Sequence, residues 1–260
     1  MEDSKKYHLL NNSRFYILCF SLLLSVMVFA WMRLQIPSDQ LFYIRTQQIF
    51  GLIAILFWYF ALVISPIGYV IGKQRMKKVE FTRRAIGVSA FYFALLHSVI
   101  ALWGQLGGLS QIQYLPTLFQ WSLGGGAVAL AVLTIMAITS FDKVVTFMTF
   151  RWWKWLHRLV YFGGILVILH IWTIGTHLAY TNVQIAALVG LIILSGLELF
   201  RVTKLLNRKY LKLARTEAAT VFLALWVIVV GLVLAIPVLV DNYHSRHTDH
   251  SAVQQEGRIA

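Results

Sequence analysis

Two histidines lie inside apolar segments of the sequence, where ionisable side chains are costly and usually functional. His97 follows Arg84 by thirteen positions, and His170 follows Arg158 by twelve. At about 1.5 Å of rise per residue, helices that enter a membrane at these arginines carry His97 roughly 20 Å and His170 roughly 18 Å deep. The sequence therefore predicts two imidazoles at nearly the same depth on two different helices.

Paired neutral imidazoles are typical axial ligands of a b-type heme, and a helical bundle supplies the flat apolar slot that a porphyrin needs. Two histidine ligands leave no open position on the iron, which favours electron transfer over oxygen binding. The alternative is that each histidine hydrogen-bonds a neighbouring helix and has only a structural role. The spacing of His97 and His170 by itself leaves both interpretations open.

A third histidine, His157, precedes His170 by thirteen residues. On an ideal helix this spacing puts the two side chains about 140° apart. A shared face would require a kink, for which Gly163–Gly164 is the expected place. Arg84 occupies the corresponding depth on the other helix, so a second heme at His157 would need an unusual second ligand. His157 is therefore either a second heme ligand or an interfacial residue.

A basic cluster lies at the depth of His157. Its members are Arg83, Arg84, Lys154 and Arg158. These cations could hold heme propionates or a reduced flavin, and the alternative is that they contact anionic lipid and set the topology.

Other metal and redox ligands are scarce in this sequence. Cys19 is the only cysteine, which excludes an intramolecular disulfide and a thiolate-bound iron–sulfur cluster. His244, His247 and His250 form a weak metal-binding pattern near the C-terminus, in a polar stretch that is typical of a disordered tail.

The composition requires lipid around most of the chain. Of 260 residues, 59% are hydrophobic and only 13% are charged, and the mean hydropathy is +0.71. Soluble domains carry roughly a quarter charged residues. The net charge of +13 does not indicate nucleic-acid binding, because the basic residues lie in short clusters between apolar runs.

Seven segments have the roughly 20 apolar residues that a transmembrane helix needs. The expected fold is all-α, a polytopic membrane bundle of about seven helices. The segments are 15–34, 47–71, 85–103, 118–138, 155–175, 183–200 and 218–240.

The distribution of Lys and Arg predicts the orientation of the bundle. Nineteen of the 23 basic residues lie on the side of the N-terminus. By the positive-inside rule, the N-terminus is cytoplasmic and the C-terminus is outside. We expect a multi-pass membrane protein, and the family that three of its segments resemble implies a bacterial inner membrane.

Three segments resemble a known family. Thr82–Gly87 followed by His97 resembles the third helix of bacterial ferric-reductase-like transmembrane proteins, and Trp155–Tyr161 followed by His170 resembles their fifth helix. Leu62–Pro66 resembles the end of their second helix. Within this superfamily, the chain is most similar to the heme-binding membrane subunit of the periplasmic methionine sulfoxide reductase system. The resemblance covers roughly residues 47–200.

The resemblance implies a six-helix core that binds heme b, with His97 and His170 as axial ligands and His157 as the ligand of a possible second heme. It implies an oxidoreductase or electron-transfer subunit that works with partners. Electrons would pass from a cytoplasmic flavin (FMN or FAD), flavin reductase or quinone to an external reductase or ferric iron. The alternative is a non-redox transporter or scaffold with structural histidines. The chain departs from the family in its seventh span, 218–240, and in its tail.

The hypothesis of a heme-binding membrane protein divides the chain into five parts. They are a cytoplasmic segment 1–14, a first span with its outer loop 15–46, a heme-binding core 47–203, an inner loop with the seventh span 204–240, and an external tail 241–260.

Overall fold

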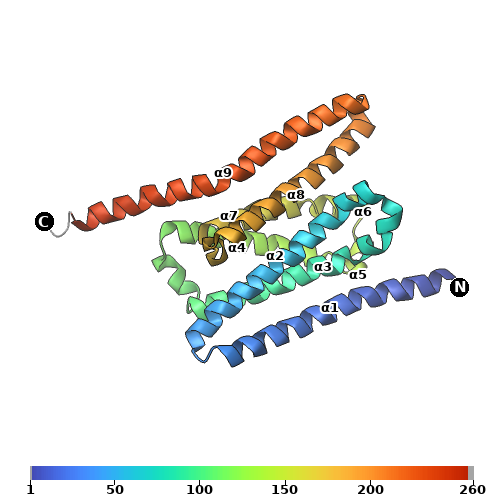
Figure 1. Cartoon of the computed structure of the whole chain (residues 1–260). Coiled ribbons are helices and arrows are strands. Elements are labelled where there is room, and N and C mark those ends of the chain that lie inside the picture. Colours follow the sequence, from blue (N-terminus) through green and yellow to red (C-terminus); the bar gives the residue numbers. More distant parts are fainter. Residues whose placement is uncertain (1, 257–260) are drawn as a thin grey trace. The chain divides into compact units, whose positions relative to one another are not determined.

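The structure is a computed structural model that describes the backbone of residues 2–256. It describes the side chains of residues 13–240 except 73, 150, 179 and 215. Within this range all regular elements are helices, joined by short connections (Figure 1). The α-helices are α1 Glu2–Gln35, α2 Asp39–Ile71, α3 Lys73–Val99, α4 Thr117–Ile138, α5 Asp142–Phe147, α6 Phe150–Leu156, α7 Leu159–Ile174, α8 Thr181–Leu206 and α9 Arg215–Glu256.

The prediction of an all-α bundle with seven spans is confirmed. Seven helices in the described part of the chain are long and apolar enough to cross a membrane. The chain is therefore a multi-pass membrane protein. The spans are Ser13–Gln35, Asp39–Ile71, Gln74–Gln105, Thr117–Ile138, Arg151–Ile174, Thr181–Leu211 and Thr216–Val240.

The last helix is longer than the sequence predicted. Its backbone stays helical to Glu256, beyond the expected end of the span at Val240 and into the expected tail. Helical hydrogen bonds are local, so a helix can continue after its apolar residues end. The side chains of His244, His247 and His250 lie outside the described residues.

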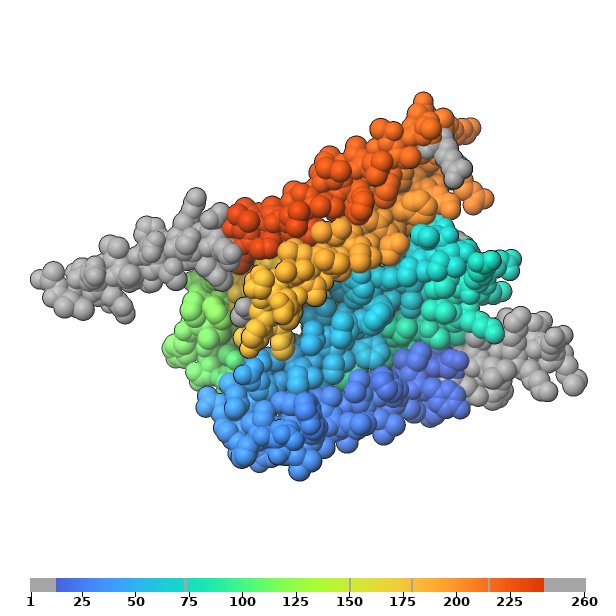
Figure 2. All heavy atoms as spheres, in the orientation of Figure 1, coloured from blue at the N-terminus to red at the C-terminus, as the bar shows by residue number. Residues whose placement is uncertain are grey.

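The chain divides into two compact units, residues 1–170 and 171–260. In the first unit α2 packs closely along α3, and α1 lies against both (Figure 2). Its apolar core centres on Phe50, Ala54 and Phe93, and Leu24 and Val28 of α1 pack against this cluster. The first helix, which the sequence placed outside the heme-binding core, is part of this unit.

Two hydrogen bonds between small or polar side chains hold α1 against α3. The hydroxyl oxygens of Ser21 and Ser89 are 2.8 Å apart, and those of Ser25 and Tyr92 are also 2.8 Å apart. Small polar residues allow transmembrane helices to approach closely and to bond across the interface. These contacts position α3, the helix that carries His97.

A π-helix, Ile100–Gln105, follows α3 just after His97. A methyl group at Gly104 would lie 2.7 Å from the Tyr43 ring, so glycine permits this close approach to α2. The amide of Gln47 donates to Gln105 at 2.9 Å across the same interface. Short π segments are common at functional sites. This one fixes the end of α2 beside His97.

The second unit contains the α8–α9 pair. Gly196 of α8 packs against the indole of Trp226, and the rings of Phe200 and Phe222 meet edge to face at 6.0 Å. Glu198 pairs with Arg201 at 2.7 Å one turn further along α8. Glu198 lies inside the predicted sixth span, and the sequence analysis did not single it out.

Candidate functional site

The structure brings together the two histidines that the sequence placed at one depth. His97 lies in the last turn of α3, and His170 lies near the end of α7. Their ring centroids are 6.3 Å apart, with the ring planes at 87°. Both side chains are half-buried.

Each imidazole is oriented by a backbone carbonyl of a neighbouring helix. Nδ1 of His97 lies 2.8 Å from the carbonyl oxygen of Gln47 in α2, and Nδ1 of His170 lies 3.0 Å from that of Ser122 in α4. A carbonyl can only accept, so each Nδ1 carries the hydrogen and donates it. The unprotonated Nε2 of each ring then keeps the lone pair that a metal ligand needs, as in many histidine metal sites.

Each ring also lies against a glycine one turn beyond that carbonyl. A methyl group at Gly51 would lie 2.9 Å from Nδ1 of His97, and one at Gly126 would lie 2.9 Å from Nδ1 of His170. The helices α2 and α4 therefore support the two rings in the same way, with a carbonyl at one position and a glycine four residues later. Sequence reasoning did not identify Gly126 as the contact of His170.

The separation of the rings suits a metal ion with two axial imidazoles. Metal–nitrogen bonds of about 2.0 Å and ring bonds of about 1.33 Å place the two ring centres about 6.3 Å apart when the ion lies between them. The observed separation is 6.3 Å. His97 and His170 therefore fit the ligand set that a b-type heme requires.

His157 lies where the fifth span is interrupted. α6 ends at Leu156, and α7 begins at Leu159. The angle of about 140° expected between His157 and His170 on an ideal helix does not apply across this break. α7 continues through Gly163 and Gly164, so the interruption of this span lies at His157 and Arg158 and not at the two glycines.

The environment of His157 resembles that of the other two rings in one respect. Its Nδ1 lies 3.1 Å from the carbonyl oxygen of Trp153, and its ring packs on the Trp153 indole with centroids 4.1 Å apart. Its Nε2 is buried and has no hydrogen-bond partner among the described residues. A buried nitrogen without a partner is unfavourable unless a ligand occupies it.

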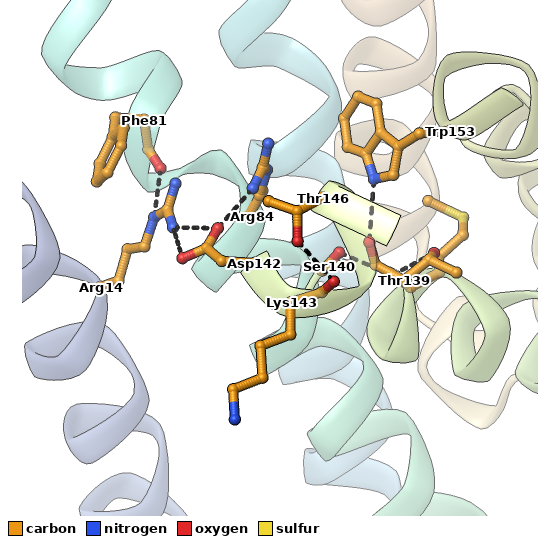
Figure 3. Close-up of polar contacts among 10 residues, drawn as sticks. Arg14, Phe81, Arg84, Thr139, Ser140, Asp142, Lys143, Thr146 and Trp153 are labelled. Carbon is orange, nitrogen blue, oxygen red and sulfur yellow. Dashed lines mark hydrogen bonds and ion pairs between the residues drawn. The ribbon is translucent and has the colours of Figure 1, made fainter. Parts of the chain in front are cut away.

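One member of the predicted basic cluster, Arg84, pairs with a carboxylate. Figure 3 shows Asp142 between Arg14 and Arg84, with nitrogen–oxygen distances of 3.2 Å and 2.9 Å. The Arg84 guanidinium also lies 5.1 Å from the centre of the Trp153 ring, which in turn packs on His157. Sequence reasoning missed Asp142, although it is the only acidic residue between Glu80 and Glu198.

The other arginines of the predicted cluster lie in different surroundings. Nε of Arg83 donates to the carbonyl oxygen of Ala61 at 2.7 Å, which ties α3 to α2. Arg158 lies in the break between α6 and α7, and its side chain is exposed. Arg84 thus has a carboxylate partner, while Arg158 is available to a ligand or to lipid.

Asp142→Asn is expected to lower the free energy of unfolding by about 1 kcal/mol, because two ion pairs of roughly 0.2–1 kcal/mol each are lost. The loss should be measured by denaturant titration in detergent. Asp39→Asn is the matched control, since Asp39 has one pair, with Arg33 at 2.7 Å, and that pair is more exposed. Equal effects of the two variants would show that the double pair adds nothing.

Part of this chain is similar to known proteins. The model of the family described as ferric reductase like transmembrane component matches residues 49–170, a stretch that contains His97, His157 and His170. The matched stretch ends at His170, earlier than the limit near residue 200 that the sequence resemblance suggested.

Three curated relatives are each named protein-methionine-sulfoxide reductase heme-binding subunit MsrQ. The relative from Pasteurella multocida is 29% identical over 119 residues, which cover 44% of this chain and 57% of that protein. The one from Ralstonia nicotianae is 30% identical over 111 residues, covering 43% and 50%. The one from Herminiimonas arsenicoxydans is 34% identical over 90 residues, covering 35% and 41%. The chain spans about half the length of these relatives. The resemblance to ferric-reductase-like transmembrane proteins that the sequence indicated is confirmed.

Proposed function

We propose that this chain, whose residues 49–170 match the ferric reductase-like transmembrane component family, is a membrane electron-transfer subunit that binds heme b between His97 and His170. The observation that carries the proposal is the distance of 6.3 Å between the ring centroids of His97 and His170. When bound, heme supplies a one-electron carrier inside the bilayer. The carbonyls of Gln47 and Ser122 hold the two rings in the tautomer that ligation needs.

The proposed direction of electron transfer is outward, from a donor at the cytoplasmic face to an acceptor at the opposite face. The positive-inside rule favours a cytoplasmic location for the end of the bundle that carries Arg14, Arg84 and His157. We propose a flavin, a flavin reductase or a quinone as donor there, with FMN or FAD near Arg158. The names of the relatives support a reductase as acceptor on the opposite face, and ferric iron is the other candidate.

A structural role of the histidines is the second candidate function. Both rings do bond a carbonyl of a neighbouring helix, as the structural interpretation requires. In that case the chain would be a scaffold or transporter without redox activity. The two functions differ in a direct observable, the absorption spectrum of the protein.

The test is the spectrum of the full chain purified from its membrane. Low-spin heme b with two imidazole ligands is expected to give a Soret band, with sharp α and β bands after reduction by dithionite. The reduced-minus-oxidised spectrum should be recorded for the protein as isolated and after incubation with hemin. A protein that stays colourless in both samples would overturn the proposal in favour of the structural role.

We further propose that His157 binds a second heme, because its buried Nε2 has no partner among the described residues. His157→Ala is expected to remove one heme per chain and to leave the spectrum of the His97–His170 site in place. Heme per chain should be measured by the pyridine hemochrome assay against protein from amino-acid analysis. An unchanged ratio would limit the chain to one heme and make His157 an interfacial residue.

A further inference from the structure

The two short helices that follow α4, namely α5 and α6, have one side attached to the bundle. Asp142, the first residue of α5, is held by Arg14 of α1 and Arg84 of α3. The indole Nε1 of Trp153 in α6 donates to the carbonyl oxygen of Thr139 at 3.0 Å (Figure 3). These bonds fix the orientation of residues 139–153 on the first unit.

The other side of this connection presents large aromatic rings to the outside. Four side chains stand out there, and their exposed fractions are 62% for Phe141, 91% for Phe147, 66% for Trp152 and 60% for Trp155. Three exposed cations alternate with these rings along the sequence, namely Lys143, Arg151 and Lys154. In a water-soluble protein, large aromatic rings are mostly packed in the interior. Exposed rings beside cations therefore suit the boundary between the acyl chains and the charged headgroups of a membrane.

We propose that residues 141–155 lie in the headgroup layer of the membrane and form a binding surface for anionic phospholipid, with Lys143, Arg151 and Lys154 on the phosphates and the four aromatic rings among the acyl ester groups. The spans α4 and α7 on either side bring this segment to the bilayer surface. Aromatic and basic side chains together are typical of segments at this depth. The proposal does not depend on heme.

The charge of the surface supports lipid as its ligand. Asp142 is the only carboxylate in the segment, and its two arginine partners compensate it. The three cations are therefore not opposed by a negative side chain of their own segment. Each basic residue near an anionic membrane surface contributes about 1 kcal/mol, equivalent to roughly a fivefold change in affinity.

Lipid at this surface would also act on the site described above. Asp142 and Trp153 belong to the same segment, and they contact Arg84 and His157 respectively. Anionic lipid would thereby fix the side of the bundle that carries His157.

The test is native mass spectrometry of the full chain titrated with dioleoylphosphatidylglycerol or dioleoylphosphatidylcholine. Lys143→Gln, Arg151→Gln and Lys154→Gln are combined in one variant. The matched control combines Arg75→Gln, Lys77→Gln and Lys78→Gln, which removes three exposed cations whose neighbours Gln74 and Met76 carry no ring. The first variant should weaken phosphatidylglycerol binding by on the order of a hundredfold, if the three contributions add. The control should weaken it less, because no aromatic ring beside these three cations holds them in the headgroup layer.

A second measurement reports depth without relying on charge. Lipids brominated near the ester groups should quench the tryptophan fluorescence of the chain in nanodiscs, and the double variant Trp152→Phe and Trp155→Phe should lose a large part of that quenching. Equal lipid affinity in the two triple variants would overturn the proposal. So would equal binding of the two lipids, or quenching that the double variant leaves unchanged.

Discussion

Replacement of either His97 or His170 by alanine is expected to abolish the low-spin heme spectrum of this protein. Each imidazole supplies one axial nitrogen, and neither ring can replace the other because each is held by its own carbonyl, that of Gln47 or Ser122. Loss of an outer-shell partner typically costs 10–100-fold in metal affinity, and loss of a ligand itself should cost more than about a hundredfold. Hemin titration followed at the Soret band measures this directly.

The control for these variants is His177→Ala. His177 lies outside the matched stretch, in the short 3-10 helix Thr176–Ala179. The His177→Ala substitution should leave the affinity for hemin and the reduced spectrum unchanged. Should either ligand variant keep a wild-type α band and wild-type hemin affinity, the assignment of that histidine as an axial ligand would be wrong.

Gly126→Ala is expected to weaken heme binding roughly 10–100-fold, the range typical of outer-shell changes. The added methyl would lie 2.9 Å from Nδ1 of His170, closer than real Cβ contacts, so the ring must move or lose its bond to Ser122. The backbone of α4 should not suffer, because alanine favours a helix over glycine by about 1 kcal/mol. A loss of heme affinity would therefore report on the ring and not on the helix.

Gly125→Ala is the matched control on the same helix, since a methyl group there would meet nothing within 4 Å. On the other side of the site, Gly51→Ala should act as Gly126→Ala does, through a contact of 2.9 Å with Nδ1 of His97. Gly87→Ala in α3, which also meets no neighbour within 4 Å, is its control. The midpoint potential and the Soret position should shift in the Gly51 and Gly126 variants only.

Equal effects at Gly125 and Gly126 would contradict this account of the glycines. The histidine and glycine variants test different parts of the proposal. The histidine variants test whether heme is bound at all, and the glycine variants test whether α2 and α4 orient its ligands.

Residue types and their order along the chain determined the number of spans and the matched depth of His97 and His170. Both follow from apolar length and from rise per residue, which are local properties of a helix. The family resemblance was also readable locally, in the residues that surround the two histidines. The exposed position of Arg158 and the ion pair of Arg84 with Asp142 could not be predicted from the local sequence.

Only the tertiary structure decided which helices support the imidazoles, because a hydrogen bond between His97 and Gln47, 50 positions apart, depends on how α2 and α3 pack. The same holds for Asp142, whose partners Arg14 and Arg84 come from two other helices. The break at His157 also depends on its surroundings, since the sequence from Trp155 to Gly175 reads as one apolar helix. The length of apolar segments sets where a chain crosses a membrane, whereas contacts between distant side chains depend on the packed bundle.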